Sequence, residues 1–139
     1  MGLVYADIEL ISGDDDTLSR RGFISESDVK KISISALVDS GAYMLAINET
    51  IRTQLDLQTV DTQTAELADG SQISLDIVAP IIVKFANRAT TCRAMVLPGN
   101  SEVLLGAIPM EDMDVVINPK EQKLTVNPAH PYIAHKPLK

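Results

Sequence analysis

Residues 36–42 read Ala-Leu-Val-Asp-Ser-Gly-Ala, so a single carboxylate follows an apolar run. Ile32, Ile34 and Ala36 alternate with serines, which predicts a strand that becomes buried as it approaches Asp39. A buried carboxylate without a partner is costly, so Asp39 must be hydrogen-bonded, paired or neutral. The small residues after it allow a sharp turn with accessible backbone N–H groups. The stretch predicts either a rigidly held, usable carboxylate or an ordinary Asp-Ser-Gly turn.

Short strands are predicted over most of the remaining chain. Hydrophobic residues make up 45% of the chain but aromatic residues only 4%, so aliphatic side chains must supply the core. Residues 3–12 alternate like a half-buried strand, and Asp69-Gly70 predicts a hairpin turn within residues 62–75 because Gly tolerates a positive φ. The other predicted strands are a second hairpin over 77–85 and 91–97, a buried strand end at 103–106, and a last pair at 114–118 and 122–127.

Two short helices are predicted among these strands. Residues 48–57 have Asn48 as N-cap, with Ile51 and Leu55 on one apolar face. The second helix covers residues 109–113 and has proline in its first turn. The sequence therefore predicts a mainly β fold with one or two short helices.

Three segments are predicted to lack regular structure. Residues 13–16, Gly-Asp-Asp-Asp, should form a solvated turn, because the ligand spacing of an EF-hand calcium loop is absent. Residues 25–28 are expected in an exposed loop. Residues 128–139 contain three of the seven prolines and should be extended, ordered only if they dock on something. We expect one domain over residues 1–127, followed by this Pro-rich tail.

Charge and hydropathy argue against nucleic-acid and membrane partners. The formal net charge is −7, and the basic residues cluster no further than the pairs at 20–21 and 30–31. A nucleic-acid binder needs a basic surface to neutralise phosphates, so no nucleic-acid partner is expected. The longest uncharged apolar stretch, residues 77–83, is too short to cross a bilayer, and the N-terminus lacks the pattern of a signal peptide.

The cysteine and histidine residues give no sign of a metal or cofactor. Cys92 is the only cysteine, which excludes an intramolecular disulfide and favours a reducing compartment, so a cytoplasmic location is expected. Cys92 lies in an apolar-polar alternation and is interpreted as a strand residue rather than a nucleophile. His130 and His135 have no third ligand nearby in the sequence, so neither a metal site nor a cofactor is expected.

The stretch around Asp39 resembles the active-site loop of retropepsin-like (clan AA) aspartic proteases, and in size the chain is most similar to their bacterial, single-domain members. Their pattern is two or three apolar residues, Asp, Thr or Ser, Gly, and usually Ala. A second family mark, two apolar residues and then Gly, is matched by residues 103–106. The family places a flap hairpin between the two marks, where residues 65–72 lie, and a short helix after them, where residues 108–113 lie. The resemblance covers residues 30–127.

The resemblance implies a small closed β-barrel in which Asp39 is catalytic. Ser40, Gly41, Ala42 and Gly106 would support the catalytic loop. The flap and substrate-binding residues would be Glu66, Leu67, Ala68, Asp69 and Gly70.

The same resemblance implies a homodimer, because the chemistry needs two carboxylates that share one proton. No other Asp in the chain is followed by Ser or Thr and then Gly, so the second carboxylate must come from a second copy. The expected assembly is a two-fold dimer with both Asp39 side chains at the axis. It would hydrolyse an extended polypeptide with a water that the two carboxylates activate.

Two departures from the family pattern leave an alternative open. Ser40 stands where Thr is usual, although either hydroxyl can make the supporting hydrogen bond, and residues 1–28 and the Pro-rich tail have no counterpart. The alternative is a catalytically silent domain that keeps the fold and serves as a dimerisation or protein-binding module. A third interpretation is an unrelated small β domain with a chance motif.

Overall fold

The computed structural model describes residues 2–136 and 138 and has a mainly β fold, which confirms the predicted class. The strands are β1 (Tyr5–Ser12), β2 (Lys31–Val38), β3 (Leu45–Asn48), β4 (Thr59–Glu66), β5 (Gln72–Phe85), β6 (Arg88–Leu97), β7 (Leu104–Leu105), β8 (Val115–Asn118) and β9 (Lys123–Val126). The helices are α1 (Gly13–Arg20), α2 (Glu49–Leu55), α3 (Ala107–Met113) and the short 3-10 helix η1 (Glu26–Asp28).

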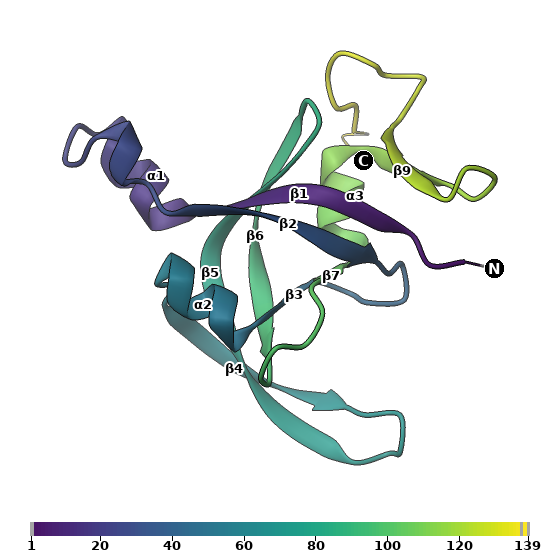
Figure 1. The fold of residues 1–139 in the computed structure, drawn as a ribbon, viewed down its shortest axis with the longest axis horizontal. Coiled ribbons are helices and arrows are strands. Elements are labelled where there is room, and N and C mark those ends of the chain that lie inside the picture. Colours follow the sequence, from purple (N-terminus) through teal and green to yellow (C-terminus); the bar gives the residue numbers. More distant parts are fainter. Residues whose placement is uncertain (1, 137, 139) are drawn as a thin grey trace.

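Six of the strands form a closed ring of hydrogen-bonded pairs (Figure 1). The order is β1-β2-β7-β3-β6-β5, and β5 returns to pair with β1 from Ser12↔Ile81 to Glu9↔Lys84. Strand β4 lies outside the ring and pairs with β5, while β8 and β9 form a separate two-stranded sheet. The structure thus shows a ring of six strands, and the closed barrel of the retropepsin-like type stays a prediction.

Aliphatic side chains fill the interior, as the shortage of aromatic residues requires. Leu10, Leu45, Ile47, Ile81 and Leu105 are fully buried and come from four different strands of the ring. Burying one such side chain is worth roughly 1.5–3 kcal/mol relative to leaving it exposed, so these residues stabilise the closure of the ring.

Helix α2 forms as its sequence predicts. The Asn48 side chain accepts a hydrogen bond from the Ile51 backbone N–H at 2.9 Å, which caps the first turn. Ile51 and Leu55 are buried, and the helix ends at Leu55, followed by the C-cap Asp56, whose φ is 50°. The second predicted helix is also present as α3, which begins two residues earlier than expected.

The predicted turn at residues 13–16 is wrong, because these residues begin helix α1. Ser12 Oγ accepts a hydrogen bond from the Asp15 backbone N–H at 3.2 Å, and three aspartates lie in the first turn, where the helix dipole favours negative charge. Arg20 Nε pairs with Asp16 Oδ2 at 3.0 Å across one turn. Among the described residues there are thus three α-helices rather than one or two.

Asp15 joins the start of α1 to the residue before β2. Its Oδ2 accepts hydrogen bonds from the backbone N–H of Lys30 at 3.0 Å and from Lys30 Nζ at 2.9 Å. Burial raises the pKa of Asp15, but the hydrogen bonds and the charge of Lys30 outweigh it, and the net pKa lies below the ordinary value. A lowered pKa in the folded state means that this stabilisation is present above the ordinary carboxyl pKa and is lost as the pH falls through the folded-state pKa.

We expect Asp15→Ala to lower the free energy of unfolding at pH 7 by about 1–2 kcal/mol, the range for hydrogen bonds to a charged group at a partly exposed site. The difference from wild type should shrink as the pH falls below 4, because wild type loses the same interaction. Urea denaturation at pH 7 and at pH 3 measures both effects. Asp14→Ala is the control, since Asp14 lies in the same first turn but is exposed. An equal loss in the two variants would contradict the role of the Lys30 contact.

Two strands differ from the predictions. Strand β5 runs without a break from Gln72 to Phe85, where the sequence suggested the arms of two separate hairpins, and its pairing with β6 shifts between Val78 and Ile81. Strand β3 was not predicted, although its first three residues are buried. In both places, pairing with the neighbouring strands of the ring determines where the strand forms, and the local sequence does not.

The described part of the Pro-rich tail, residues 128–136, contacts the rest of the chain through polar groups. Asn87 Nδ2 donates to the Pro131 carbonyl oxygen at 2.9 Å, and Lys136 Nζ pairs with Asp112 Oδ1 at 3.1 Å. The prediction for residues 137 and 139 lies outside the described residues. Within residues 2–136 and 138, no helix combines the length and the apolar character needed to cross a membrane.

Candidate active-site loop

Asp39 follows directly after β2, and β7 fixes its backbone. Strands β2 and β7 are parallel, with Leu37 opposite Leu104 and Val38 opposite Leu105. The Asp39 backbone N–H extends this pairing by donating to the Leu105 carbonyl oxygen at 3.0 Å. The Asp39 side chain is therefore placed by two strands of the ring at the point where β2 leaves it.

The loop after Asp39 orients the carboxylate through backbone N–H groups. Gly41 N donates to Asp39 Oδ1 at 3.0 Å, and Ala42 N donates to the Asp39 carbonyl oxygen at 3.0 Å. A Cβ at Gly41 would lie 3.2 Å from Asp39 Oδ1, so glycine lets the loop approach the carboxylate closely. Ser40 is exposed, and the structure shows no hydrogen bond of its hydroxyl among the described residues. Asp39, Gly41 and Ala42 thus lie together, as predicted. The expected hydrogen bond of the Ser40 hydroxyl is not seen among the described residues.

Gly106 lies directly beneath this loop, at the N-cap of α3. The first two residues of the helix, Ala107 and Ile108, donate their N–H groups to the carbonyl oxygens of Ala42 and Tyr43 at 2.9 and 3.0 Å. A Cβ at Gly106 would lie 2.8 Å from the Ala42 carbonyl oxygen and closer still to that of Met44. Only glycine fits here without displacing the loop, so the two motifs that the sequence singled out form one unit.

The predicted hairpin at Asp69-Gly70 is confirmed as the connection between β4 and β5. Leu67 N donates to the Ser71 carbonyl oxygen at 2.7 Å, and Gly70 has a φ of +86°, a conformation that glycine adopts readily. Asp69 Oδ1 accepts hydrogen bonds from the Ser71 hydroxyl and backbone N–H at 2.5 and 2.9 Å, and these lower the pKa of Asp69.

The hairpin tip is separate from the loop around Asp39. Residues 66–70 are exposed, and no hydrogen bond joins them to residues 39–44 in the described chain. Figure 1 shows that the tip of the β4–β5 hairpin and the loop between β2 and β3 project toward the same side of the molecule. In the described chain the hairpin tip and the loop around Asp39 are thus two separate features that no hydrogen bond joins.

Sequence reasoning missed the residues that anchor the base of this hairpin. Arg52 on α2 donates from Nη2 to Thr59 Oγ1 on β4 at 2.6 Å and from Nη1 to Asp76 Oδ2 on β5 at 3.1 Å. Arg93 on β6 donates to Asp61 Oδ2 on β4 at 2.9 Å. No local pattern marks these pairs, because the partners lie in different helices and strands, from 7 to 32 residues apart along the chain.

Exposed apolar side chains lie around the loop. Tyr43 is 75% exposed and Ile108, which is hydrogen-bonded to it through the backbone, is 39% exposed. Leu3 is 67% exposed and precedes Val4, whose carbonyl oxygen accepts from Val38 N beside Asp39. Clustered exposed apolar residues are typical of an interaction surface.

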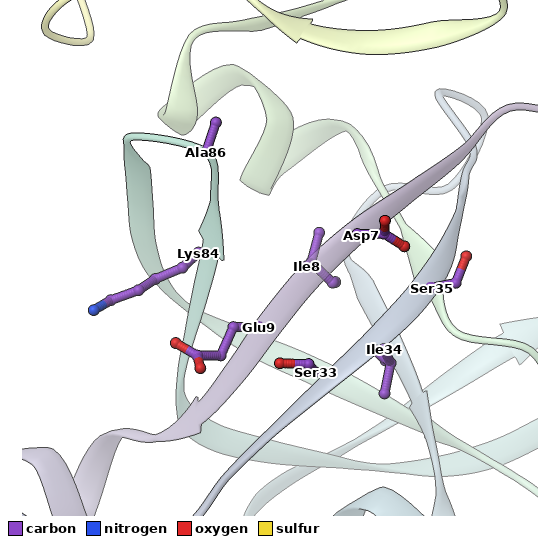
Figure 2. Close-up of a pocket in the computed structure, with 8 residues that line it drawn as sticks. All are labelled: Asp7, Ile8, Glu9, Ser33, Ile34, Ser35, Lys84 and Ala86. Carbon is purple, nitrogen blue, oxygen red and sulfur yellow. The ribbon is translucent and has the colours of Figure 1, made fainter.

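A second feature with charged groups lies elsewhere, in an open surface hollow of about 510 Å³ on β1, β2 and β5 (Figure 2). Glu9 pairs in register with both Ser33 and Lys84, on the strands to either side of β1, and Asp7 is opposite Ser35 further along. The hollow is lined by Asp7, Ile8, Glu9, Ser33, Ile34, Ser35, Lys84 and Ala86, and so does not include Asp39.

Cys92 does not have the character of a nucleophile. It lies in β6, half-buried, as its alternation predicted. Burial, with a smaller contribution from the charge of Asp112, raises the pKa of the Cys92 thiol to about 12, so the reactive thiolate is scarce near neutral pH. Within residues 2–136 and 138, no three side chains of His, Cys, Asp or Glu are grouped so that they could hold a metal ion.

Compared with known proteins, the chain matches no protein-family model. It also matches no curated protein. The function of the loop must therefore be inferred from its geometry and its motif.

Proposed function

We propose that the chain is one subunit of a homodimeric, retropepsin-like aspartic endopeptidase in which Asp39 is the catalytic carboxylate. The observation that carries this proposal is the loop at residues 39–44, which is fixed by backbone hydrogen bonds to β7 on one side and to the first turn of α3 on the other. A carboxylate held this way can keep one geometry through a reaction, as general acid–base catalysis requires.

A dimer is needed because each chain contributes one such carboxylate. Two carboxylates that share a proton can divide the work: one takes a proton from the attacking water, and the other polarises and then protonates the scissile amide. The exposed Leu3, Tyr43 and Ile108 supply apolar surface beside Asp39 that a second copy would cover. In an isologous dimer the same residues meet across the axis, which brings the two Asp39 side chains together.

The β4–β5 hairpin would serve as the flap. Its tip, residues 66–70, carries exposed polar groups and backbone that can pair with an extended polypeptide. Closure over the substrate would exclude water and strengthen the electrostatic interactions at the site. Arg52 and Arg93 hold only the base of the hairpin, so the tip can move while the base stays in place.

Incubation with a mixture of unstructured peptides from pH 4 to pH 9, followed by mass spectrometry, tests the proposal. We expect cleavage at acidic to neutral pH that declines toward alkaline pH, because the pair of carboxylates must retain one shared proton. A peptide that carries a hydroxyl-bearing tetrahedral carbon in place of a cleaved amide should inhibit, since it imitates the transition state. Cleavage that stays constant up to pH 9 would contradict the shared proton. A dimer that cleaves no peptide would support the silent binding module instead.

A further inference from the structure

The C-terminal segment is held on the domain by polar contacts and not by apolar packing. Its large apolar residues point away from the domain, since Tyr132 is 89% exposed and Ile133 76% exposed. Three contacts of residues 127–136 converge on one carboxylate, that of Asp114, which lies at the C-cap of α3. Whether a segment held in this way stays bound to the domain depends on the charge state of a few groups.

Asp114 receives three hydrogen bonds from the segment. The donors are the Asn127 side chain at 3.1 Å, His130 Nδ1 at 2.8 Å and the His135 backbone N–H at 3.0 Å. The hydrogen bonds from the His135 backbone and the Asn127 side chain are the main cause of the low pKa of Asp114, about 2. Asp114 therefore remains a carboxylate across the range in which histidines change their charge.

The two histidines continue this chain of hydrogen bonds. His130 Nε2 lies 2.9 Å from His135 Nδ1, and the ring centres are 4.4 Å apart. Because the Asp114 carboxylate can only accept, the proton between it and His130 resides on Nδ1. Neutral His130 then has an unprotonated Nε2, which accepts from His135 Nδ1–H.

The arrangement accommodates one additional proton but not two. If His130 becomes an imidazolium, its Nε2–H can donate to His135, provided that neutral His135 carries its own proton on Nε2. The first proton therefore preserves both hydrogen bonds and adds charge attraction to Asp114. If both rings are protonated, two N–H donors face each other at a distance that suits one hydrogen bond, and two positive charges repel.

We propose that residues 127–136 form a pH-operated latch, which stays closed with up to one extra proton on the His130–His135 pair and opens when the second proton binds. The latch closes on the C-terminal end of α3, whose first turn supports the loop around Asp39. Its opening therefore frees the far end of the helix on which the candidate site rests.

The charges around the pair favour opening once both rings are charged. Arg88 on β6 is buried, with Nη2 4.0 Å from Asp114 Oδ2 and a hydrogen bond from Nη2 to the His130 carbonyl oxygen. Lys136 is neutralised by Asp112 at 3.1 Å, so this pair adds little net charge. With both histidines protonated, three cations surround the single Asp114 carboxylate.

Heteronuclear NOE measurements on the ¹⁵N-labelled full chain between pH 7.5 and pH 4.5 test the latch. We expect rigid amides at residues 129–136 at pH 7.5 and mobile ones at the acidic end, while the Ile47 amide in the core stays rigid throughout. Because opening takes up one proton, the ratio of closed to open latch should fall about tenfold per pH unit below the midpoint.

Two variants distinguish the paired-histidine latch from general loosening at low pH. In His135→Ala the remaining His130 imidazolium is attracted to Asp114, so residues 129–134 should stay rigid at pH 4.5. In Asp114→Asn the segment should be mobile already at pH 7.5. A wild-type segment that stays rigid at pH 4.5 would overturn the proposal, and so would a His135→Ala variant that loosens over the same range as wild type.

Discussion

Asp39→Asn should abolish peptide cleavage while leaving the fold and the dimer intact. The amide is nearly the same size as the carboxylate and can still accept the hydrogen bond that Gly41 N donates to Asp39 Oδ1. It cannot act as a general base or carry the shared proton, so the rate should fall by about 10²–10⁴-fold or more, the usual contribution of general acid–base catalysis. Initial rates with a peptide found to be cleaved by wild type, together with the mass of the particle in solution, measure both effects.

Asp7→Asn is the matched control for this substitution. Asp7 is an exposed carboxylate on β1, in the hollow that does not include Asp39, so the control removes the same charge without touching the loop. Its cleavage rate should equal that of wild type. Activity that survives in Asp39→Asn would show that Asp39 is not the catalytic residue.

Gly106→Ala should destabilise the chain strongly although it adds only a single methyl group. The new Cβ would lie 2.8 Å from the Ala42 carbonyl oxygen and 2.9 Å from the Met44 carbonyl carbon, and both belong to backbone that cannot move aside cheaply. Overpacking of this kind costs roughly 1–3 kcal/mol. The strain falls on residues 42–44, so cleavage should be lost as well, even at temperatures where the chain remains folded.

Gly2→Ala is a suitable control for the added methyl group. Its Cβ would meet the Gln122 side chain, which is flexible and can rotate away. Urea denaturation should therefore show a stability close to that of wild type. If Gly106→Ala matched Gly2→Ala in both stability and cleavage, the contact between α3 and the loop would not constrain the site.

The sequence predicts well those elements whose signals are local. Asn48 has the side chain that caps a helix, and Asp69-Gly70 has the residues that a tight hairpin turn requires, so both features appear where they were expected. Gly106 was singled out by its motif alone. The structure supplies the physical reason, which is the close approach of the Ala42 and Met44 carbonyl groups.

Elements that depend on distant partners could not be predicted in the same way. Helix α1 is a different case: it starts with Gly-Asp-Asp-Asp, which has low helix propensity, and it was missed although two local signals, Ser12 as a cap and the Asp16–Arg20 pair, could have indicated it. The local sequence does not indicate that Asp114 accepts hydrogen bonds from the C-terminal segment, because its partners His130 and His135 are 16 and 21 residues away along the chain.

One chain contains only half of the proposed site. The sequence identifies one carboxylate and its supporting loop, and the geometry explains how β7 and α3 hold them. In the proposed dimer, a second copy of the chain supplies the second carboxylate. The same copy buries the exposed side chains of Leu3, Tyr43 and Ile108. The central claim is therefore that the active form is a dimer.

Activity in mixed dimers tests that claim most directly. Wild type and Asp39→Asn, unfolded together in equal amounts and refolded, should give particles of twice the 15.1 kDa chain mass in which about one quarter contain two Asp39 carboxylates. If each site needs both carboxylates, cleavage should fall to about one quarter of that of the same total amount of wild type. Cleavage that falls only to one half, in proportion to the wild-type chains, would contradict a site shared between two subunits.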